Sequence, residues 1–231
     1  MSYDYSAIAQ ETARILLDIE AIRLRPEDPF TLVSGGKSPA YVNCRRIIRF
    51  PQARTKLMEF ATTLIRHKFS QKPFAAIAGG ETAGIPFAAF IAERLDLPMC
   101  YVRKKPKGYG MNLLIEGGIE AGERVLFVDD QASDGKSKVG FVKSLREAGA
   151  EVSDALVVFF YDIFPHSQKQ LATAGINLHA LATWRDVLAV AGDSGKVNDS
   201  QLQELTAYVN DPIAWSIRHG GTPPDEVAKT G

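Results

Sequence analysis

The fold prediction starts from residues 124–137, Arg-Val-Leu-Phe-Val-Asp-Asp-Gln-Ala-Ser-Asp-Gly-Lys-Ser. Within them the apolar run 125–128 predicts a buried strand that ends at two carboxylates, Asp129 and Asp130, and a helical pattern follows over 136–148. A helix N-terminus offers unpaired N–H groups and the positive end of the helix dipole, which suit a phosphate. Carboxylates suit sugar hydroxyls instead. The segment therefore indicates a sugar-phosphate site, and on its own it also fits an ordinary strand–loop–helix turn.

Strand-like and helical stretches alternate along the rest of the chain, which predicts an α/β fold with a doubly wound, mainly parallel sheet. Ligands of such sheets bind beyond the carboxyl ends of the strands. The other predicted strands are 74–78, 99–102, 155–161 and 178–183, the predicted helices are 6–21, 51–69 and 85–95, and 30–33 with 41–44 are predicted to form a hairpin. Residues 184–231 are predicted to add helical appendages.

The composition excludes several classes of protein. The 27 basic and 27 acidic residues balance, so bulk charge gives no reason to expect a nucleic-acid partner. No basic segment leads into an apolar core at the N-terminus, and no apolar run has membrane-spanning length. Cys44 and Cys100 lie in or beside predicted strands, as reduced core residues do. We therefore expect a cytoplasmic protein with no membrane partner.

Two further loops follow predicted strands. The first is Gly79-Gly80-Glu81-Thr82-Ala83, whose glycines allow a close approach to an anion and whose following helix presents its N-terminus. The second has four cations within residues 103–107, followed by Gly108-Tyr109-Gly110. A basic loop next to glycines can close over a polyphosphate. Taken singly, the first also fits a tight turn and the second a solvated surface.

Together with the stretch from Phe30 to Asn43, these motifs resemble those of orotate phosphoribosyltransferases, a branch of the type I phosphoribosyltransferases. The strand–loop–helix segment resembles the family's signature for phosphoribosyl pyrophosphate (PRPP). The positions that fit the signature are Asp129, Asp130, Ser133, Gly135 and Ser137. The glycine loop and residues 159–164 resemble the branch found in alphaproteobacteria, and the resemblance covers residues 5–222.

The resemblance implies a type I phosphoribosyltransferase fold with an N-terminal hood and C-terminal helical appendages. It implies one domain over 1–231, with a hood over about 1–50, a core over about 51–190 and helices over about 191–220. The implied activity is that of a glycosyltransferase of the pentosyltransferase class. It would transfer phosphoribosyl from PRPP to orotate, giving orotidine 5′-phosphate and pyrophosphate in pyrimidine biosynthesis.

The resemblance also assigns roles to residues. Lys107 would be catalytic, Asp129 and Asp130 would hold the ribose hydroxyls, and the loop 133–137 would hold the 5′-phosphate. The implied substrate-binding residues are Arg103, Lys104, Tyr109, Gly79, Gly80, Glu81, Thr82, Ala83, Asp129, Asp130, Gln131, Ala132, Ser133, Asp134, Gly135, Lys136, Ser137, Tyr41 and Val42. Mg²⁺ would be carried by oxygens of the substrate, and no protein residue is assigned as its direct ligand. The family also implies a homodimer in which the loop 103–117 reaches the neighbouring site.

Several positions depart from the family pattern. Val33 replaces a lysine that contacts PRPP, Tyr109 replaces the loop histidine, and Ile163 stands where other branches place an arginine for the orotate carboxylate. Gln131 and Asp134 also depart from the PRPP signature. A carboxylate about 4 Å from a phosphate costs roughly 4 kcal/mol at an effective dielectric near 20.

These departures leave two alternative functions open. One is a non-catalytic paralogue that binds PRPP or a nucleotide, and the three features that favour it are Asp134, Gln131 and Tyr109. The other is a phosphoribosyltransferase for another base, which the absence of arginine at position 163 permits. Fold alone does not separate them.

Overall fold

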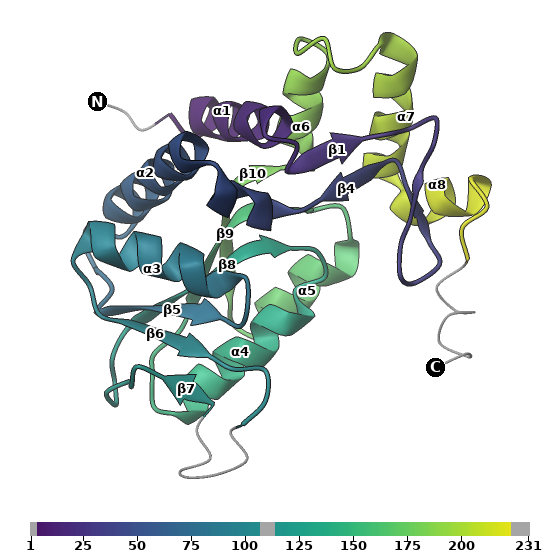
Figure 1. The fold of residues 1–231 in the computed structure, drawn as a ribbon. Helices are drawn as coiled ribbons and strands as arrows, with labels where there is room; N and C mark the ends of the chain where they lie inside the picture. Colours follow the sequence, from purple (N-terminus) through teal and green to yellow (C-terminus); the bar gives the residue numbers. More distant parts are fainter. Residues whose placement is uncertain (1–3, 107–113, 223–231) are drawn as a thin grey trace. The chain divides into compact units, whose positions relative to one another are not determined.

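The computed structural model describes residues 4–106 and 114–222, and these residues form two compact units (Figure 1). Unit 1 contains Asp4 and Ile48–Leu181, and unit 2 contains Tyr5–Ile47 and the residues from Ala182 to 222. The expected organisation as one domain with appendages stays a prediction. No helix in the two described ranges has both the length and the apolar character needed to cross a membrane.

Unit 1 is built around a six-stranded sheet with the order β10-β9-β8-β5-β6-β7. Its strands are β5 (Ala76–Gly80), β6 (Met99–Val102), β7 (Ile115–Glu116), β8 (Val125–Ala132), β9 (Asp154–Phe160) and β10 (Asn177–Thr183). The pairs β5–β6, β5–β8 and β8–β9 are parallel, and β6–β7 is antiparallel. This confirms the predicted mainly parallel sheet.

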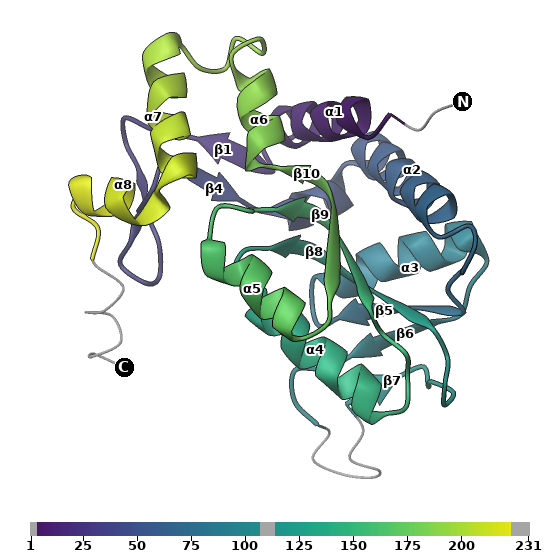
Figure 2. The same ribbon diagram turned by 180° about the vertical axis from the view of Figure 1, so that it is seen from behind.

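Helices cover both faces of this sheet, so the doubly wound prediction is also confirmed. They are α2 (Pro51–Lys68), α3 (Gly84–Leu95), α4 (Lys136–Glu147) and α5 (Pro165–Thr173). Helices α2 and α3 lie on one face, and α4 and α5 lie on the other (Figures 1 and 2). All seven residues of β9 are buried, as expected for a strand covered on both sides.

Strand β8 is longer than the sequence suggested. Its pairing with β9 continues from Asp129, opposite Val157, to Ala132, opposite Phe160. The N–H of Tyr161 donates a further hydrogen bond to the carbonyl of Ala132, at 2.9 Å. The acidic pair therefore lies inside the strand and not beyond its end, because the backbone pairing with β9 is independent of side-chain polarity.

A buried polar network lies at the amino ends of β8, β9 and β10. The carboxylate of Asp154 is 3.2 Å from Arg124 Nη2, 2.9 Å from His179 Nε2 and 2.7 Å from Ser153 Oγ. Lys68 Nζ lies 3.0 Å from the other ring nitrogen of His179. Burial alone would raise the pKa of Asp154, but the hydrogen bonds from His179 and Ser153 outweigh it and lower that pKa.

Unit 2 combines helices with two small antiparallel sheets. Its elements are α1 (Tyr5–Asp18), β1 (Ile22–Leu24), β2 (Phe30–Thr31), β3 (Lys37–Ser38), β4 (Ala40–Val42), α6 (Trp184–Ala191), α7 (Asp199–Asn210) and α8 (Pro212–Arg218), and a 3₁₀ helix, η1 (Cys44–Arg49), runs from unit 2 into unit 1. The C-terminal helical prediction is confirmed. Both cysteines are buried free thiols.

The predicted pairing of 30–33 with 41–44 is wrong. Strand β2 pairs with β3, and β4 pairs with β1. A tight turn causes the difference, because Gly35 adopts φ 78° and its N–H donates to the carbonyl of Leu32 at 2.8 Å. The chain therefore returns at Lys37, earlier than expected, which leaves Tyr41 to pair with Arg23.

Candidate active site

The site in unit 1 lies where three neighbouring parallel strands end. Strand β5 lies between β6 and β8, so the residues after Gly80, Val102 and Ala132 emerge at the same edge of the sheet. This edge brings together the predicted glycine loop, the start of the predicted basic loop and the predicted phosphate loop. Tyr41 and Val42 belong to unit 2 and are described within it.

The two carboxylates of the acidic pair have different surroundings. Asp129 is 6% exposed and Asp130 is 7% exposed. Asp129 Oδ1 accepts the backbone N–H of Asp130 at 2.9 Å, and Asp129 Oδ2 lies 2.7 Å from Lys138 Nζ. Burial, followed by the charge of Asp129, raises the pKa of Asp130 to about 6, while Lys138 acts in the opposite direction. Asp129 is thus held in an ion pair, whereas Asp130 is a buried carboxyl group with a raised pKa.

Lys138 is not among the site residues predicted from the sequence, although the sequence contains a signal for it. The buried residues of α4 are Lys138, Phe141, Val142 and Leu145, which have the spacing of one helix face. A lysine on the apolar face of the first turn of a helix, in the helix that follows an acidic strand, indicates a buried ion pair.

The phosphate loop follows β8 directly. Gly135 adopts φ 80° before α4, a conformation that favours glycine, and an added Cβ would lie 3.1 Å from the side chain of Leu171. Ser133, Lys136 and Ser137 are exposed around this turn. The first turn of α4 therefore presents backbone N–H groups beside side chains that water can reach.

The carboxylate of Asp134 is engaged within this loop. Its Oδ1 accepts the backbone N–H of Lys136 at 3.1 Å, and its Oδ2 lies 3.9 Å from Lys136 Nζ. Lys136 neutralises part of the charge that Asp134 brings to the phosphate loop, since the two groups form a solvent-exposed ion pair.

The glycine loop packs closely against the acidic pair. Gly79 and Gly80 end β5, and Glu81, Thr82 and Ala83 lead into α3, with a cis peptide bond between Glu81 and Thr82. A Cβ added to Gly84 would lie 2.6 Å from the carbonyl oxygen of Val128 and 3.1 Å from Asp129 Oδ1. Only glycine allows α3 to begin this close to β8.

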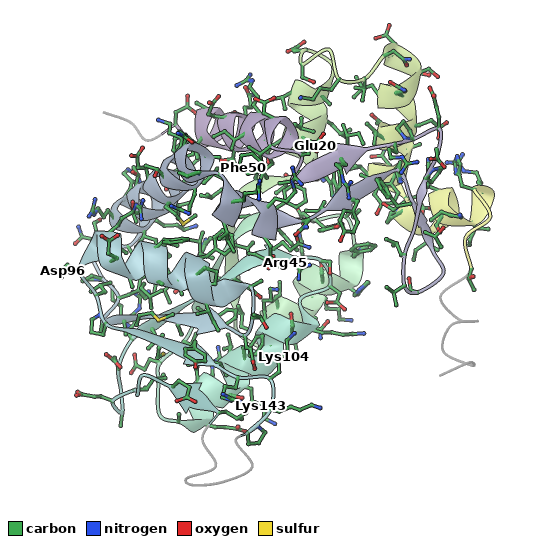
Figure 3. All side chains as sticks on the ribbon, viewed as in Figure 1. Glu20, Arg45, Phe50, Asp96, Lys104 and Lys143 are labelled. Carbon is green, nitrogen blue, oxygen red and sulfur yellow. The ribbon has the colours of Figure 1, made fainter. Side chains whose placement is uncertain are left out.

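The start of the basic loop is joined to the glycine loop. Glu81 accepts the backbone N–H of Lys104 at 2.6 Å through Oε2, and its own N–H donates to the carbonyl of Val102 at 2.8 Å. Arg103 Nη1 lies 3.6 Å from Oε1 of Glu116 in β7, as an ion pair. Lys104 is exposed at the beginning of the loop, where Figure 3 labels it. The predicted catalytic Lys107 and the predicted ligand Tyr109 lie outside the described residues.

In unit 2, Tyr41 belongs to a cluster of aromatic rings and arginines. Its ring centroid lies 5.7 Å from that of Phe30, and the guanidinium of Arg23 lies 5.3 Å from the Tyr41 ring. Val42 is 5% exposed, so its side chain packs inside the unit. The cluster offers flat aromatic faces and positive charge, features that suit a planar anion.

The fold and this site are those of a phosphoribosyltransferase. A family profile described as the phosphoribosyl transferase domain matches residues 46–170, which shows the same class. The chain is 50% identical over 212 residues to the orotate phosphoribosyltransferase of Roseobacter denitrificans, covering 92% of this chain and 94% of that protein. It is also 50% identical over 208 residues to the orotate phosphoribosyltransferase of Cereibacter sphaeroides, covering 90% of each. The chain therefore belongs to the orotate phosphoribosyltransferase family, as its motifs predicted.

A solved structure shares the fold. The orotate phosphoribosyltransferase of Aeropyrum pernix aligns with a TM-score of 0.65 and 29% identity, covering 78% of this chain and 99% of that chain. The resemblance predicted from sequence is confirmed at the level of family and fold.

Proposed function

We propose that the chain transfers the phosphoribosyl group of PRPP to a ring nitrogen of orotate, releasing pyrophosphate and forming orotidine 5′-phosphate for pyrimidine nucleotide synthesis. One observation carries the proposal. A buried acidic pair in β8 precedes the Gly135 turn and the N-terminus of α4, in a chain half identical to orotate phosphoribosyltransferases. This arrangement offers acceptors for ribose hydroxyls next to donors for a phosphate.

The residues of unit 1 would mainly bind and orient PRPP. Asp129 and Asp130 would accept hydrogen bonds from the ribose hydroxyls, and the backbone N–H groups at the start of α4 would donate to the 5′-phosphate. Fixing both ends of the ribose places C1 for attack by the base. Such positioning lowers the entropic part of the barrier.

Negative charge develops on the leaving pyrophosphate as the bond to C1 breaks. Arg103, Lys104 and Lys107 would stabilise that charge, with Lys107 as the catalytic residue. Among the described residues no group of three or more His, Cys, Asp or Glu gathers as a metal site. As the family resemblance implies, Mg²⁺ would be held mainly by the oxygens of PRPP and would supply positive charge there.

The geometry of Asp134 weakens the main argument for a binding-only paralogue. That argument rested on an unbalanced carboxylate in the phosphate loop. The ion pair with Lys136 and the hydrogen bond from its N–H reduce the repulsion toward a phosphate. Catalysis is therefore the favoured function.

The direct test is turnover. The protein is incubated with PRPP, Mg²⁺ and orotate, and the loss of orotate absorbance is followed, with uracil, hypoxanthine and nicotinate as control bases. We expect pyrophosphate release that depends on orotate. Binding of PRPP without turnover of any base would support the binding-only paralogue, and turnover of a different base would change the assigned substrate.

We also propose a cytoplasmic homodimer in which each loop 103–117 acts in its neighbour's site. An inactive Lys107→Ala chain mixed with an inactive chain carrying Asp129→Asn and Asp130→Asn should then recover activity. A mixed dimer would contain one site in which both functions are intact. Subunit exchange is checked by native mass spectrometry, and a mixed dimer without activity would assign each loop to its own subunit.

A further inference from the structure

Lys138 is an unusual residue for the position that it holds. It is 6% exposed and lies on the apolar face of α4 together with Phe141 and Leu145. Lysine is almost never fully buried unless its ammonium group is paired, since desolvation of the charge is costly. Here Nζ lies 2.7 Å from Asp129 Oδ2 and 3.3 Å from Ser137 Oγ.

The ion pair fixes Asp129 in one orientation. One carboxylate oxygen faces Lys138, and the other accepts the backbone N–H of Asp130. Side chains of β8 alternate between the two faces of the sheet, and Val125 and Phe127 belong to the core cluster that contains Phe141 of α4. The same alternation directs the side chain of Asp129 toward α4, where it forms the ion pair with Lys138.

Stability alone gives little reason to keep this pair. Replacing a buried ion pair by apolar residues of similar size is often neutral or stabilising, because the pair loses hydration on folding. The position of the pair suggests a different use. Its carboxylate is a direct neighbour of Asp130, and the two acids would otherwise repel each other inside a buried strand.

We propose that Lys138 is a positioning residue for the ribose of PRPP: it holds the carboxylate of Asp129 in one orientation beside Asp130, so that the acidic pair is fixed to receive the ribose hydroxyls. The inference rests on the proposed function of this site. Two carboxylates and one ammonium group leave the acidic pair with a single net negative charge. That charge suits hydroxyl donors and adds less repulsion toward the phosphates of PRPP than two charges would.

The decisive variant is Lys138→Met, which keeps the length of the side chain and removes its charge. The carboxyl group of Asp130 then loses a cation that lowers its pKa, and it takes up a proton more readily. The dissociation constant of PRPP should rise about tenfold near neutral pH, and the difference from the original chain should shrink toward about pH 9, where Asp130 ionises again. The KM for PRPP should rise in the same way, with a smaller effect on kcat.

Lys143→Met is the matched control on the same helix. Lys143 lies near the exposed surface of α4, where Figure 3 labels it, with 74% of its side chain exposed and an ion pair to Glu147 at 3.7 Å. Its removal should leave PRPP affinity unchanged at every pH, since exposed pairs contribute little. An affinity loss in Lys138→Met that is the same at every pH, or no loss, would overturn the proposal.

A double-mutant comparison covers the case in which Lys138→Met does not fold. The chain with both Asp129→Asn and Lys138→Met removes both charges of the buried ion pair, so neither partner is left without the other. If Lys138 acts through Asp129, this chain and Asp129→Asn alone should bind PRPP equally, because the second change removes nothing further. A further tenfold loss in the double variant would refute action through Asp129.

A titration without ligand separates this inference from the proposed function. Carboxyl-carbon NMR of aspartate-labelled protein, with Asp130→Asn for assignment, follows the acidic pair in the absence of PRPP. The titration midpoint should move to higher pH in Lys138→Met and stay in place in Lys143→Met. An unmoved midpoint would refute the role of Lys138, whereas a moved midpoint in a chain that binds no PRPP would contradict only the assigned substrate.

Discussion

Gly84→Ala should lower the unfolding temperature, whereas the same change at Gly140 should raise it. A Cβ at position 84 would lie 2.6 Å from the carbonyl oxygen of Val128, closer than real Cβ atoms approach such an atom. Helix α3 must then move away from β8, and such overpacking costs about 1–3 kcal/mol. For a chain of this size that corresponds to a fall of about 2–12 °C.

Gly140 lies within α4, and an added Cβ there would have no atom within 4 Å. Alanine should therefore stabilise this helix by about 0.5–1 kcal/mol, a rise of about 1–4 °C. Thermal unfolding by far-ultraviolet circular dichroism measures both shifts, and calorimetry measures PRPP affinity. Only Gly84→Ala should also weaken PRPP binding, because its Cβ would press on Asp129 Oδ1 at 3.1 Å. A Gly84→Ala chain with the original unfolding temperature and PRPP affinity would refute the argument from close packing.

Three further predictions concern other parts of the chain. Lys107→Ala should lower kcat far more than it weakens PRPP binding, because its charge acts as the pyrophosphate leaves; rapid-quench kinetics showing an unchanged chemical step would remove its catalytic role. Asp154→Ala should lower stability by about 3–5 kcal/mol in denaturant unfolding, because it leaves the mostly buried Arg124 without its carboxylate, and a loss below about 1 kcal/mol would contradict this. Lys136→Met should weaken PRPP binding more in the original chain than in an Asp134→Thr background, since only the original chain keeps a carboxylate to neutralise; equal effects in calorimetry would show that Lys136 does not act through Asp134.

The strands and helices of the sheet could largely be predicted, because their signals are local. The helix after Pro51 and the apolar run before Tyr161 have strong periodicity or strong burial, and α2 and β9 are found there. Strand β7 and the pairing of β1 with β4 were not predicted. Strands of two or three residues are too short to show periodicity in the sequence. Their pairing depends on the turn at Gly35 and on the neighbouring strand β6.

The position of the candidate site in the fold could be predicted in part, because it also depends on local signals. Loops that follow strands could be placed at one edge of the sheet from topology alone, and the structure puts Glu81, Lys104 and Ser133 there. The separate environments of Asp129 and Asp130 could not be predicted, since they depend on the partner that α4 supplies. Helical spacing identifies Lys138 as inward-facing, but only the three-dimensional contact shows which carboxylate it meets.

The network around Asp154 has a consequence for altering this protein by laboratory evolution. It ties the amino ends of three strands together, while the acidic pair lies about 16 Å further along β8, five residues at about 3.3 Å each. Random changes in the recognition loops therefore leave that anchor intact, and a library aimed at new acceptor bases can tolerate substitutions that a less firmly tied sheet would not. Libraries should accordingly spare Arg124, Asp154 and His179 and place their diversity at the opposite edge.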